Sequence, residues 1–138
     1  MALIEIRPAA PGDLAAIAAI QRASPDAAHW DASEYLKYNC IVAIVDQRVV
    51  GFLVFREAAD EREVLNLAVD PAFRRRGVAA TLLCAALRSS PGRWFLEVRA
   101  SNRAARELYR KVGFIEASVR LDYYESPPEH AIVLKFFS

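Results

Sequence analysis

The sequence predicts an α/β fold built on one mixed sheet, and three observations support this prediction. Short runs rich in β-branched and aromatic residues alternate with amphipathic runs of helical period. Clusters of Pro, Gly, Ser and Asp separate these runs, as turns require. A strand, a helix and a second strand follow one another over residues 64–98. Such a crossover is right-handed and leaves its two strands parallel.

The N-terminal part of the chain predicts a strand followed by two helices. Residues 3–7 alternate between apolar and polar side chains, which indicates a strand that ends at Pro8. Residues 13–21 repeat alanine, leucine and isoleucine near helical spacing, and a Ser-Pro-Asp turn at residues 24–26 ends that pattern. Residues 32–38 favour a second, shorter helix.

The remaining elements follow from the same two periodicities, which distinguish strands from helices. A turn at residues 46–48, Pro71, Gly92 and Gly113 mark where individual elements end. The predicted elements are strands at 41–45, 49–55 and 64–69, a helix at 78–87, a strand at 94–98, a helix at 102–111, and strands at 114–124 and 131–136.

Length and charge limit the classes of protein to consider. A chain of 138 residues suits a single domain over residues 1–138. Its 18 basic and 17 acidic residues leave a formal charge of +1, so no global field favours nucleic acid or an anionic membrane. No apolar run reaches the roughly twenty residues that span a bilayer, and residues 1–7 lack a secretory pattern. We therefore expect a cytoplasmic protein with no nucleic-acid or membrane partner.

The cysteines and histidines indicate neither a disulfide nor a metal site. Cys40 and Cys84 lie in apolar surroundings without Cys-x-x-Cys spacing, so both are predicted to be buried thiols. His29 and His130 have no cysteine or carboxylate partners at metal-ligand spacing. The sequence thus predicts no metal.

A basic turn at residues 69–80 leads into small residues at the start of a predicted helix. The first amides of a helix lack internal partners and carry partial positive charge, so they attract anions. Gly77 and Ala79 leave room for phosphate oxygens, and the preceding arginines add positive potential. Neither a Walker A loop nor a Gly-x-Gly-x-x-Gly fingerprint occurs in the chain. Spacing alone leaves two interpretations open: a pyrophosphate site or a solvated basic turn.

The surrounding motifs resemble a known family. The pattern Arg-x-x-Gly-x-Ala at Arg74, Gly77 and Ala79 resembles the acetyl-coenzyme A (acetyl-CoA) loop of the GNAT superfamily. The more specific run LEVRASN at residues 96–102, followed by Leu108-Tyr109 and Val112-Gly113-Phe114, resembles the RimI-type ribosomal-protein-alanine N-acetyltransferases. A tyrosine pair at residues 123–124 matches the same family. The resemblance extends to about residue 136 and is strongest over residues 65–124.

This resemblance implies a fold and a cofactor site. It implies a mostly antiparallel sheet, splayed between its fourth and fifth strands, with helices on both faces. The pantetheine arm of acetyl-CoA would lie in the gap like an extra strand, and the helix start would hold the pyrophosphate. The cofactor-binding residues that the resemblance implies are Leu67, Ala68, Val69, Arg74, Arg75, Arg76, Gly77, Val78, Ala79, Ala80 and Asn102.

The resemblance also implies roles in catalysis. Acetyl transfer to an amine needs a base, stabilisation of the developing oxyanion, and a proton for the leaving thiolate. Glu97 matches the family's general base and Tyr109 its general acid, and a backbone N–H within residues 67–69 would stabilise the oxyanion. Without the resemblance, Glu97 reads as an exposed carboxylate at a strand end and Tyr109 as a helix residue packed on the sheet.

The acceptor is predicted to be a protein N-terminus. An α-amine has a pKa near 8 and a lysine about 10.4, so a modest base suits the α-amine. The resemblance implies the N-terminal alanine of a small-subunit ribosomal protein, with Trp30 and Tyr124 as either walls of the acceptor groove or core residues. Asp122 and His29 depart from the family pattern, which leaves peptide selectivity open. Asp122, Glu125 and Glu129 form either an acidic lip or a solvated loop.

Two other functions remain open at the level of sequence. The same cofactor loop serves acetyltransferases that modify a small amine or a lysine side chain. A non-catalytic acyl-CoA-binding module would keep the loop but would not need Glu97 and Tyr109 together.

Overall fold

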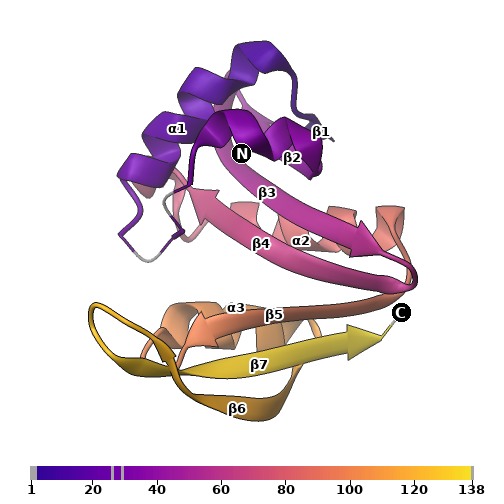
Figure 1. Cartoon of the computed structure of the whole chain (residues 1–138). Helices are drawn as coiled ribbons and strands as arrows, with labels where there is room; N and C mark the ends of the chain where they lie inside the picture. Colours follow the sequence, from indigo (N-terminus) through magenta and orange to yellow (C-terminus); the bar gives the residue numbers. More distant parts are fainter. Residues whose placement is uncertain (1–2, 26, 29, 138) are drawn as a thin grey trace.

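The computed structural model describes residues 3–25, 27–28 and 30–137. Predicted strands and helices occur in the predicted order (Figure 1). The elements are β1 (Glu5–Pro8), η1 (Pro11–Asp13), α1 (Leu14–Arg22), η2 (Ala32–Lys37), β2 (Asn39–Val45), β3 (Arg48–Ala58), β4 (Glu61–Val69), η3 (Pro71–Phe73), α2 (Val78–Ser89), β5 (Arg93–Arg99), α3 (Arg103–Val112), β6 (Ile115–Tyr124) and β7 (Glu129–Phe137).

The described strands form one seven-stranded sheet in the order β1-β2-β3-β4-β5-β7-β6. Neighbours pair antiparallel except β4 and β5, which are parallel as the crossover predicts. The turn between β2 and β3 contains only Asp46 and Gln47, both with positive φ, which is the geometry that favours two-residue hairpins. The mixed α/β fold is therefore confirmed.

Three boundaries differ from the prediction for physical reasons. The segment predicted as a helix at 32–38 is a 3₁₀ helix, η2, over Ala32–Lys37, and the Asp31 side chain caps it by accepting from the Ser33 N–H. The strands β3 and β4 extend beyond the apolar runs to residues 58 and 61, because an ion pair between Arg56 and Glu63 accompanies the ladder there. The first strand begins at Glu5, since Leu3 lies 90% exposed outside the sheet.

The sheet is split between β4 and β5. Their register pairs Glu61 with Arg93, Arg62 with Trp94, and Glu63 with Phe95, and no further pair is formed by the described residues. Beyond these pairs the two strands diverge toward their C-terminal ends (Figure 1). The rest of β4 keeps β3 as its partner, so its other edge faces the gap. The splayed sheet that the family resemblance implies is thus confirmed.

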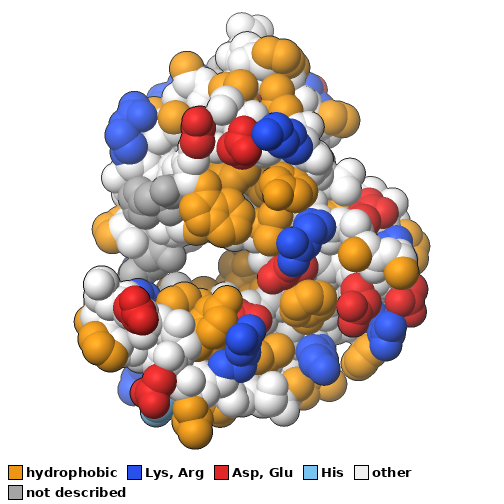
Figure 2. Space-filling view, viewed as in Figure 1, with side chains coloured by type: hydrophobic (Ala, Val, Ile, Leu, Met, Phe, Trp, Pro, Cys, Tyr) orange, Lys and Arg blue, Asp and Glu red, His pale blue; other side chains and the backbone are white. Residues whose placement is uncertain are grey.

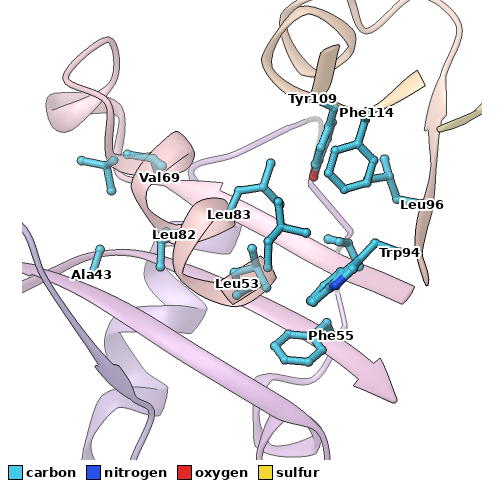
Figure 3. Packing of buried hydrophobic residues seen from close by; sticks show 14 of the residues in the cluster. Ala43, Leu53, Phe55, Val69, Leu82, Leu83, Trp94, Leu96, Tyr109 and Phe114 are labelled. Atoms are coloured by element: carbon cyan, nitrogen blue, oxygen red, sulfur yellow. The ribbon is translucent and has the colours of Figure 1, made fainter. Parts of the chain in front are cut away.

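Two apolar cores lie on opposite faces of the sheet. On one face, Leu82 and Leu83 of α2 lie over Leu53 of β3, and the rings of Trp94 and Phe55 approach to 4.7 Å (Figure 3). The other face packs α1 and η2 against β2 and β3; its buried members include Ile17, Tyr35, Val42, Phe52 and Val54. Helices therefore cover both faces of the N-terminal half of the sheet.

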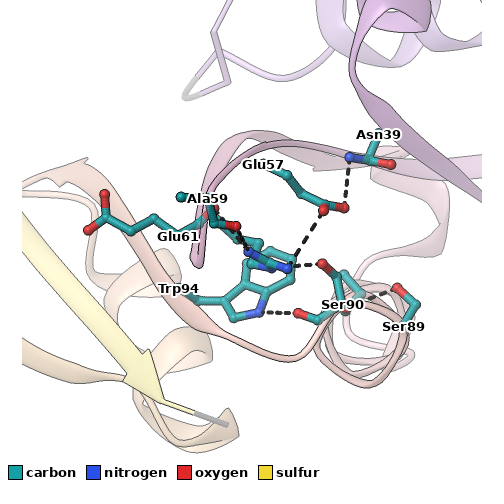
Figure 4. A network of polar contacts seen from close by, with 9 residues as sticks. Asn39, Glu57, Ala59, Glu61, Ser89, Ser90 and Trp94 are labelled. Atoms are coloured by element: carbon teal, nitrogen blue, oxygen red, sulfur yellow. Dashed lines mark hydrogen bonds and ion pairs between the residues drawn. The ribbon is translucent and has the colours of Figure 1, made fainter.

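A polar network holds the closed end of the split. The Arg62 guanidinium donates to Ser90 Oγ at 2.8 Å and to the Ala59 carbonyl at 3.0 Å, and it lies 3.6 Å from Glu57. The Trp94 indole donates to the Ser90 carbonyl at 3.0 Å (Figure 4). Since the Arg62 side chain is only 12% exposed, this network ties β4, β5 and the end of α2 together where the two strands still pair.

Two sequence predictions concern cysteines and membrane spans. Cys40 and Cys84 are both free thiols. Cys40 is buried, which raises its pKa to about 12, whereas Cys84 is half-buried on α2, so the prediction of full burial was wrong for Cys84. Within the described part of the chain, no helix has the length and apolar character that a membrane crossing needs.

Candidate active site

The gap between β4 and β5 opens into two adjoining cavities. The larger, of about 530 Å³, lies between β4, β5 and the tyrosine pair near the end of β6, and the smaller, of about 290 Å³, lies between β4, α3 and the start of α2. Both cavities are lined by Pro25, Ala27, Leu67, Asn102, Ala105 and Tyr109. A continuous channel therefore crosses the split sheet from the basic turn to the tyrosine pair.

The smaller cavity contains the predicted cofactor strand. Leu67, Ala68 and Val69 line it from β4, and Asn102 lines it from the start of α3. The Asn102 side chain caps α3 by accepting from Ala105 N–H at 3.1 Å. On the α3 side the lining includes the small residues Ala104 and Ala105. An extended chain can thus lie beside the free edge of β4 with little steric hindrance.

The basic turn supplies an N-terminal helix site at α2. Gly77 is the N-cap residue at φ 79°, a left-handed conformation that glycine adopts without strain, and the position of its missing Cβ is open. The helix begins at Val78, so its first amides lack intrahelical acceptors. Ala79 lines the smaller cavity. The unpaired amides at the start of α2 and the open space at Gly77 therefore fit a phosphate group.

The three arginines of this turn take different positions. Arg74 lines the smaller cavity, and its guanidinium donates to the Val69 carbonyl and to Ser24 Oγ, each at 3.3 Å. Arg76 lies over the Phe73 ring at 5.0 Å, and Arg75 has a positive φ of 63°. Neither cavity is lined by five of the predicted cofactor-binding residues: Arg75, Arg76, Gly77, Val78 and Ala80. Val78 is buried beneath the start of α2.

Glu97 projects from β5 into the larger cavity. Its side chain is 14% exposed, and Oε1 accepts from Arg120 Nη1 at 2.8 Å. Its second oxygen, Oε2, is buried and has no hydrogen-bond partner among the described residues. The Tyr123 hydroxyl lies close enough to hydrogen-bond with this carboxylate, which is the main cause that raises the pKa of Tyr123. Arg120 thus occupies Oε1, and Oε2 is left without a hydrogen bond of normal geometry although the Tyr123 hydroxyl is close.

Tyr109 lies on α3 and lines both cavities. Its ring packs edge-on against Phe114 at 5.3 Å, and the two rings lie side by side in Figure 3. Burial raises the pKa of Tyr109 above its usual range, so its hydroxyl stays protonated at neutral pH. Tyr109 is consequently both a core residue and one of the six residues that line both cavities.

Aromatic side chains form the outer wall of the larger cavity. Trp30 and Tyr124 both line it. Arg99 lies over the Tyr124 ring at 4.4 Å and Arg120 over the Tyr123 ring at 4.2 Å. Figure 2 shows the hollow between the two halves, with apolar side chains around it and oppositely charged side chains adjacent at its edge.

The predicted acidic lip is not formed as a unit. Glu129 accepts from Ser101 N–H at 2.5 Å and lies 3.4 Å from Arg99, so it is engaged within the fold. Asp122, with a side chain 88% exposed, interacts with His130. Neither these residues nor Glu125 line the larger cavity. His29, whose effect on the acceptor was left open, lies outside the described residues.

Several lining residues were missed by the sequence analysis. Glu63 and Tyr123 line the larger cavity, and Arg120 pairs with Glu97. Asn66 is buried there beside the predicted cofactor strand. A polar side chain inside the apolar run at 64–69 was the available signal for Asn66. No local pattern marks Arg120, because its ion pair depends on how β6 lies relative to β5.

The described residues contain no group of three His, Cys, Asp or Glu side chains positioned to hold a metal ion.

Comparisons with known proteins agree with this geometry. Residues 10–114 match the Acetyltransferase (GNAT) family. A [ribosomal protein bS18]-alanine N-acetyltransferase of Haemophilus ducreyi is 34% identical over 73% of this chain and 74% of that protein. The ribosomal-protein-S18-alanine N-acetyltransferase structure from Escherichia coli has a TM-score of 0.83 at 28% identity, over 97% of this chain and 93% of that one. A GNAT acetyltransferase from Elizabethkingia anophelis, solved with acetyl-CoA bound, shares the fold at TM-score 0.80 and 18% identity, over 98% of each chain.

Proposed function

This chain belongs to the GNAT family of acetyl-CoA-dependent N-acetyltransferases, and from that membership we propose that it acetylates the N-terminal α-amine of a protein. The proposed co-substrate is acetyl-CoA, and the proposed acceptor is the N-terminal alanine of a small-subunit ribosomal protein. The named activity of the Haemophilus ducreyi relative supports this choice of acceptor. A cytoplasmic location is proposed with it, since ribosomal proteins are found there.

The observation that carries the proposal is the free oxygen of Glu97. A buried carboxylate oxygen without a hydrogen-bond partner is uncommon and costs free energy unless a donor arrives. The ammonium group of an acceptor brings such donors. We therefore propose that Oε2 receives the α-ammonium and takes its proton, directly or through a water molecule. Arg120, bound to Oε1, holds the carboxylate in this orientation.

Tyr109 is the proposed acid. It lines both cavities, so a thioester at their junction would lie beside its hydroxyl. The raised pKa keeps the proton on the phenol until a thiolate forms. Attack of the neutral amine on the thioester carbonyl forms the amide C–N bond and breaks the C–S bond. The departing sulfur then takes the Tyr109 proton, and the second proton that the amine loses as the amide forms restores the Tyr109 phenol, while the first ammonium proton stays on Glu97 until it passes to solvent.

The smaller cavity and the start of α2 support acetyl-CoA as the co-substrate, which supplies an activated acetyl group as a thioester. The free edge of β4 at Leu67, Ala68 and Val69 offers main-chain groups to the pantetheine arm. The N-terminus of α2, with its open position at Gly77, offers unpaired amides to the pyrophosphate.

An α-amine suits this site better than a lysine side chain. At neutral pH a modest carboxylate base can deprotonate an amine of pKa near 8 far more readily than one near 10.4. The aromatic wall of Trp30, Tyr123 and Tyr124 also surrounds the approach to Glu97, where the backbone of an N-terminal residue can lie.

Mass spectrometry of peptides incubated with acetyl-CoA tests the acceptor. Peptides that begin with Ala, Ser or Met should be acetylated at the α-amine, Ala-initiated ones fastest, and blocked peptides that contain lysine should not react. Modification of the blocked peptides alone would contradict the α-amine acceptor.

A change of Glu97 tests the base. Glu97→Gln should lower turnover at least about a hundredfold, most strongly at low pH, where little of the amine is already neutral. Glu107→Gln, an exposed change on α3, is the matched control. An unchanged rate–pH profile in Glu97→Gln would exclude Glu97 as the base.

A further inference from the structure

The buried amide of Asn66 joins the two halves of the proposed site. Asn66 lies on β4, and only 6% of its surface is exposed. Its side chain contacts both the edge of β4 and the segment that walls the larger cavity. We propose that Asn66 is a positioning residue that couples occupancy of the CoA gap to the acceptor wall at Ala28 and Trp30. This inference rests on the proposed function.

One end of the coupling is the Asn66 oxygen. Asn66 Oδ1 accepts from the Leu67 backbone N–H at 3.0 Å. Leu67 lines both cavities and belongs to the edge of β4 that has no strand partner. The register of β3 and β4 shifts beside this point, because Val54 pairs with Asn66 and Phe55 with Val64. The shift leaves Leu65 as a bulged residue, and a bulge redirects the groups next to it.

The other end is the Asn66 nitrogen. Nδ2 lies 3.0 Å from the Ala28 carbonyl, 3.0 Å from the Tyr35 hydroxyl and 3.2 Å from Gln21 Oε1. The Tyr35 hydroxyl donates to the same Gln21 oxygen. Gln21 Nε2 then donates to the Trp30 carbonyl at 2.5 Å. The main chain at both wall residues is therefore held by one buried network.

The network is buried and mutually saturated, so its members move together. Gln21 is 6% exposed and Tyr35 is fully buried. In such surroundings the loss of a partner leaves a buried polar group unsatisfied, which costs free energy. A change at one member is therefore transmitted to the rest.

Competition for one hydrogen links the network to the gap. The Leu67 N–H carries a single hydrogen, so a carbonyl oxygen in the gap that accepts it competes with Asn66 Oδ1 and weakens that contact. The freed amide then reorients, and Nδ2 changes its contacts with Ala28, Tyr35 and Gln21. Occupancy of the gap thus alters the acceptor wall without any contact between the two ligands. The coupling is reciprocal, so the acceptor also changes the affinity for CoA.

Hydrogen exchange with free CoA tests the inference without an acceptor or a reaction. In the parent protein, CoA should alter amide exchange both at residues 74–80, where it binds, and at residues 22–32, which include the wall. Tyr35→Phe removes one hydroxyl from the network but keeps the ring against Phe52, 5.7 Å away. In this variant CoA should still protect residues 74–80, while the response at residues 22–32 falls by at least about half.

Two further variants complete the test. Gln21→Met removes the link to the Trp30 carbonyl and should behave as Tyr35→Phe does, so the result does not depend on one variant folding. Tyr38→Phe changes a tyrosine that is 42% exposed and should respond as the parent does. In steady-state assays, Tyr35→Phe should raise KM for an Ala-initiated peptide about fivefold or more and change KM for acetyl-CoA less than about twofold.

The outcomes separate this inference from the proposed function. If CoA changed amide exchange in the parent protein at residues 74–80 but not at residues 22–32, the coupling alone would be overturned. The coupling alone would also be overturned if CoA changed amide exchange at residues 22–32 as strongly in Tyr35→Phe and Gln21→Met as in the parent protein. If CoA altered neither segment in the parent, the coupling and the proposed co-substrate would fall together.

Discussion

Glu97 and Tyr109, the proposed base and acid, differ in their surroundings. Glu97 has one oxygen fixed by Arg120 and one oxygen without a partner, so it can accept a proton without first breaking a bond. Tyr109 is held by ring packing against Phe114, and burial keeps it protonated. At the residue scale, the proposed site therefore combines a proton acceptor, Glu97, with a proton donor, Tyr109, in the lining of one cavity.

Tyr109→Phe isolates the role of the hydroxyl. The ring packing against Phe114 remains, so stability should change little, but kcat should fall about a hundredfold or more because the leaving thiolate loses its proton source. CoA affinity, measured by calorimetry, should stay within about twofold of the parent. Thiol release gives the rate. Tyr38→Phe serves as the control, and full activity in Tyr109→Phe would remove the hydroxyl from the mechanism.

At the element scale, the chain holds its first helix in place with an ion pair. Arg7 of β1 donates to both oxygens of Asp13, at 2.7 and 3.0 Å. Asp13 Oδ2 also accepts from Ala10 N–H at 2.8 Å. The pair therefore fixes the connection through which α1 reaches the sheet, and α1 contributes Gln21 to the network around Asn66.

Asp13→Asn should make the protein less stable in a pH-dependent way. Hydrogen bonding from Arg7 lowers the pKa of Asp13 below its ordinary value. The stabilisation is therefore present above the unfolded pKa, near 4, and is lost as pH falls through the lower folded pKa. Urea unfolding should show Asp13→Asn to be less stable than the parent by about 1 kcal/mol at pH 7. The difference should shrink toward pH 2.

Asp60→Asn provides the comparison, because Asp60 also pairs with an arginine, at 2.9 Å, but is 68% exposed. Solvent screens such a pair, so its removal should matter less at pH 7. A stability difference for Asp13→Asn that is the same at pH 7 and pH 2 would refute the role of its charge.

At the scale of the whole molecule, function depends on a sheet that is closed at one end and open at the other. Pairing of β4 with β5 stops after Glu63 and Phe95, and the cavities begin beyond that point. The halves stay joined through this short ladder and through the apolar contacts of α2 and α3. Arg62 adds a polar link at the closed end.

Arg62→Met should weaken this closed end. The change removes donors to Ser90 Oγ and the Ala59 carbonyl while the methylene stem can still pack, so the free energy of unfolding should fall by about 1–3 kcal/mol. Amide exchange in β5 should rise accordingly. Arg56→Met, which removes a pair whose arginine is 52% exposed, should cost less. Equal losses in the two variants would mean that the Arg62 network does not hold the halves together.

Much of the fold was predictable because its signals are local. The β-branched and aromatic runs in residues 41–55 and the helical period in residues 78–87 reflect which side chains are buried in the core, so they are visible in the sequence. The parallel pair β4 and β5 followed from the handedness of a crossover. The 3₁₀ form of η2 and the extension of β3 to Ala58 were not predictable, because side-chain caps and cross-strand ion pairs decide them.

The sequence by itself determined the family, through the LEVRASN run, the basic turn before Gly77 and Tyr109, since these motifs are the ones that match the family. Only the tertiary structure decided what surrounds Glu97 and what Asn66 contacts. Arg120 comes from a strand 23 residues away from Glu97, and Asn66 meets Gln21 across 45 residues of chain. Contacts at such separations leave no periodicity in the sequence, because they depend on how distant elements pack against one another.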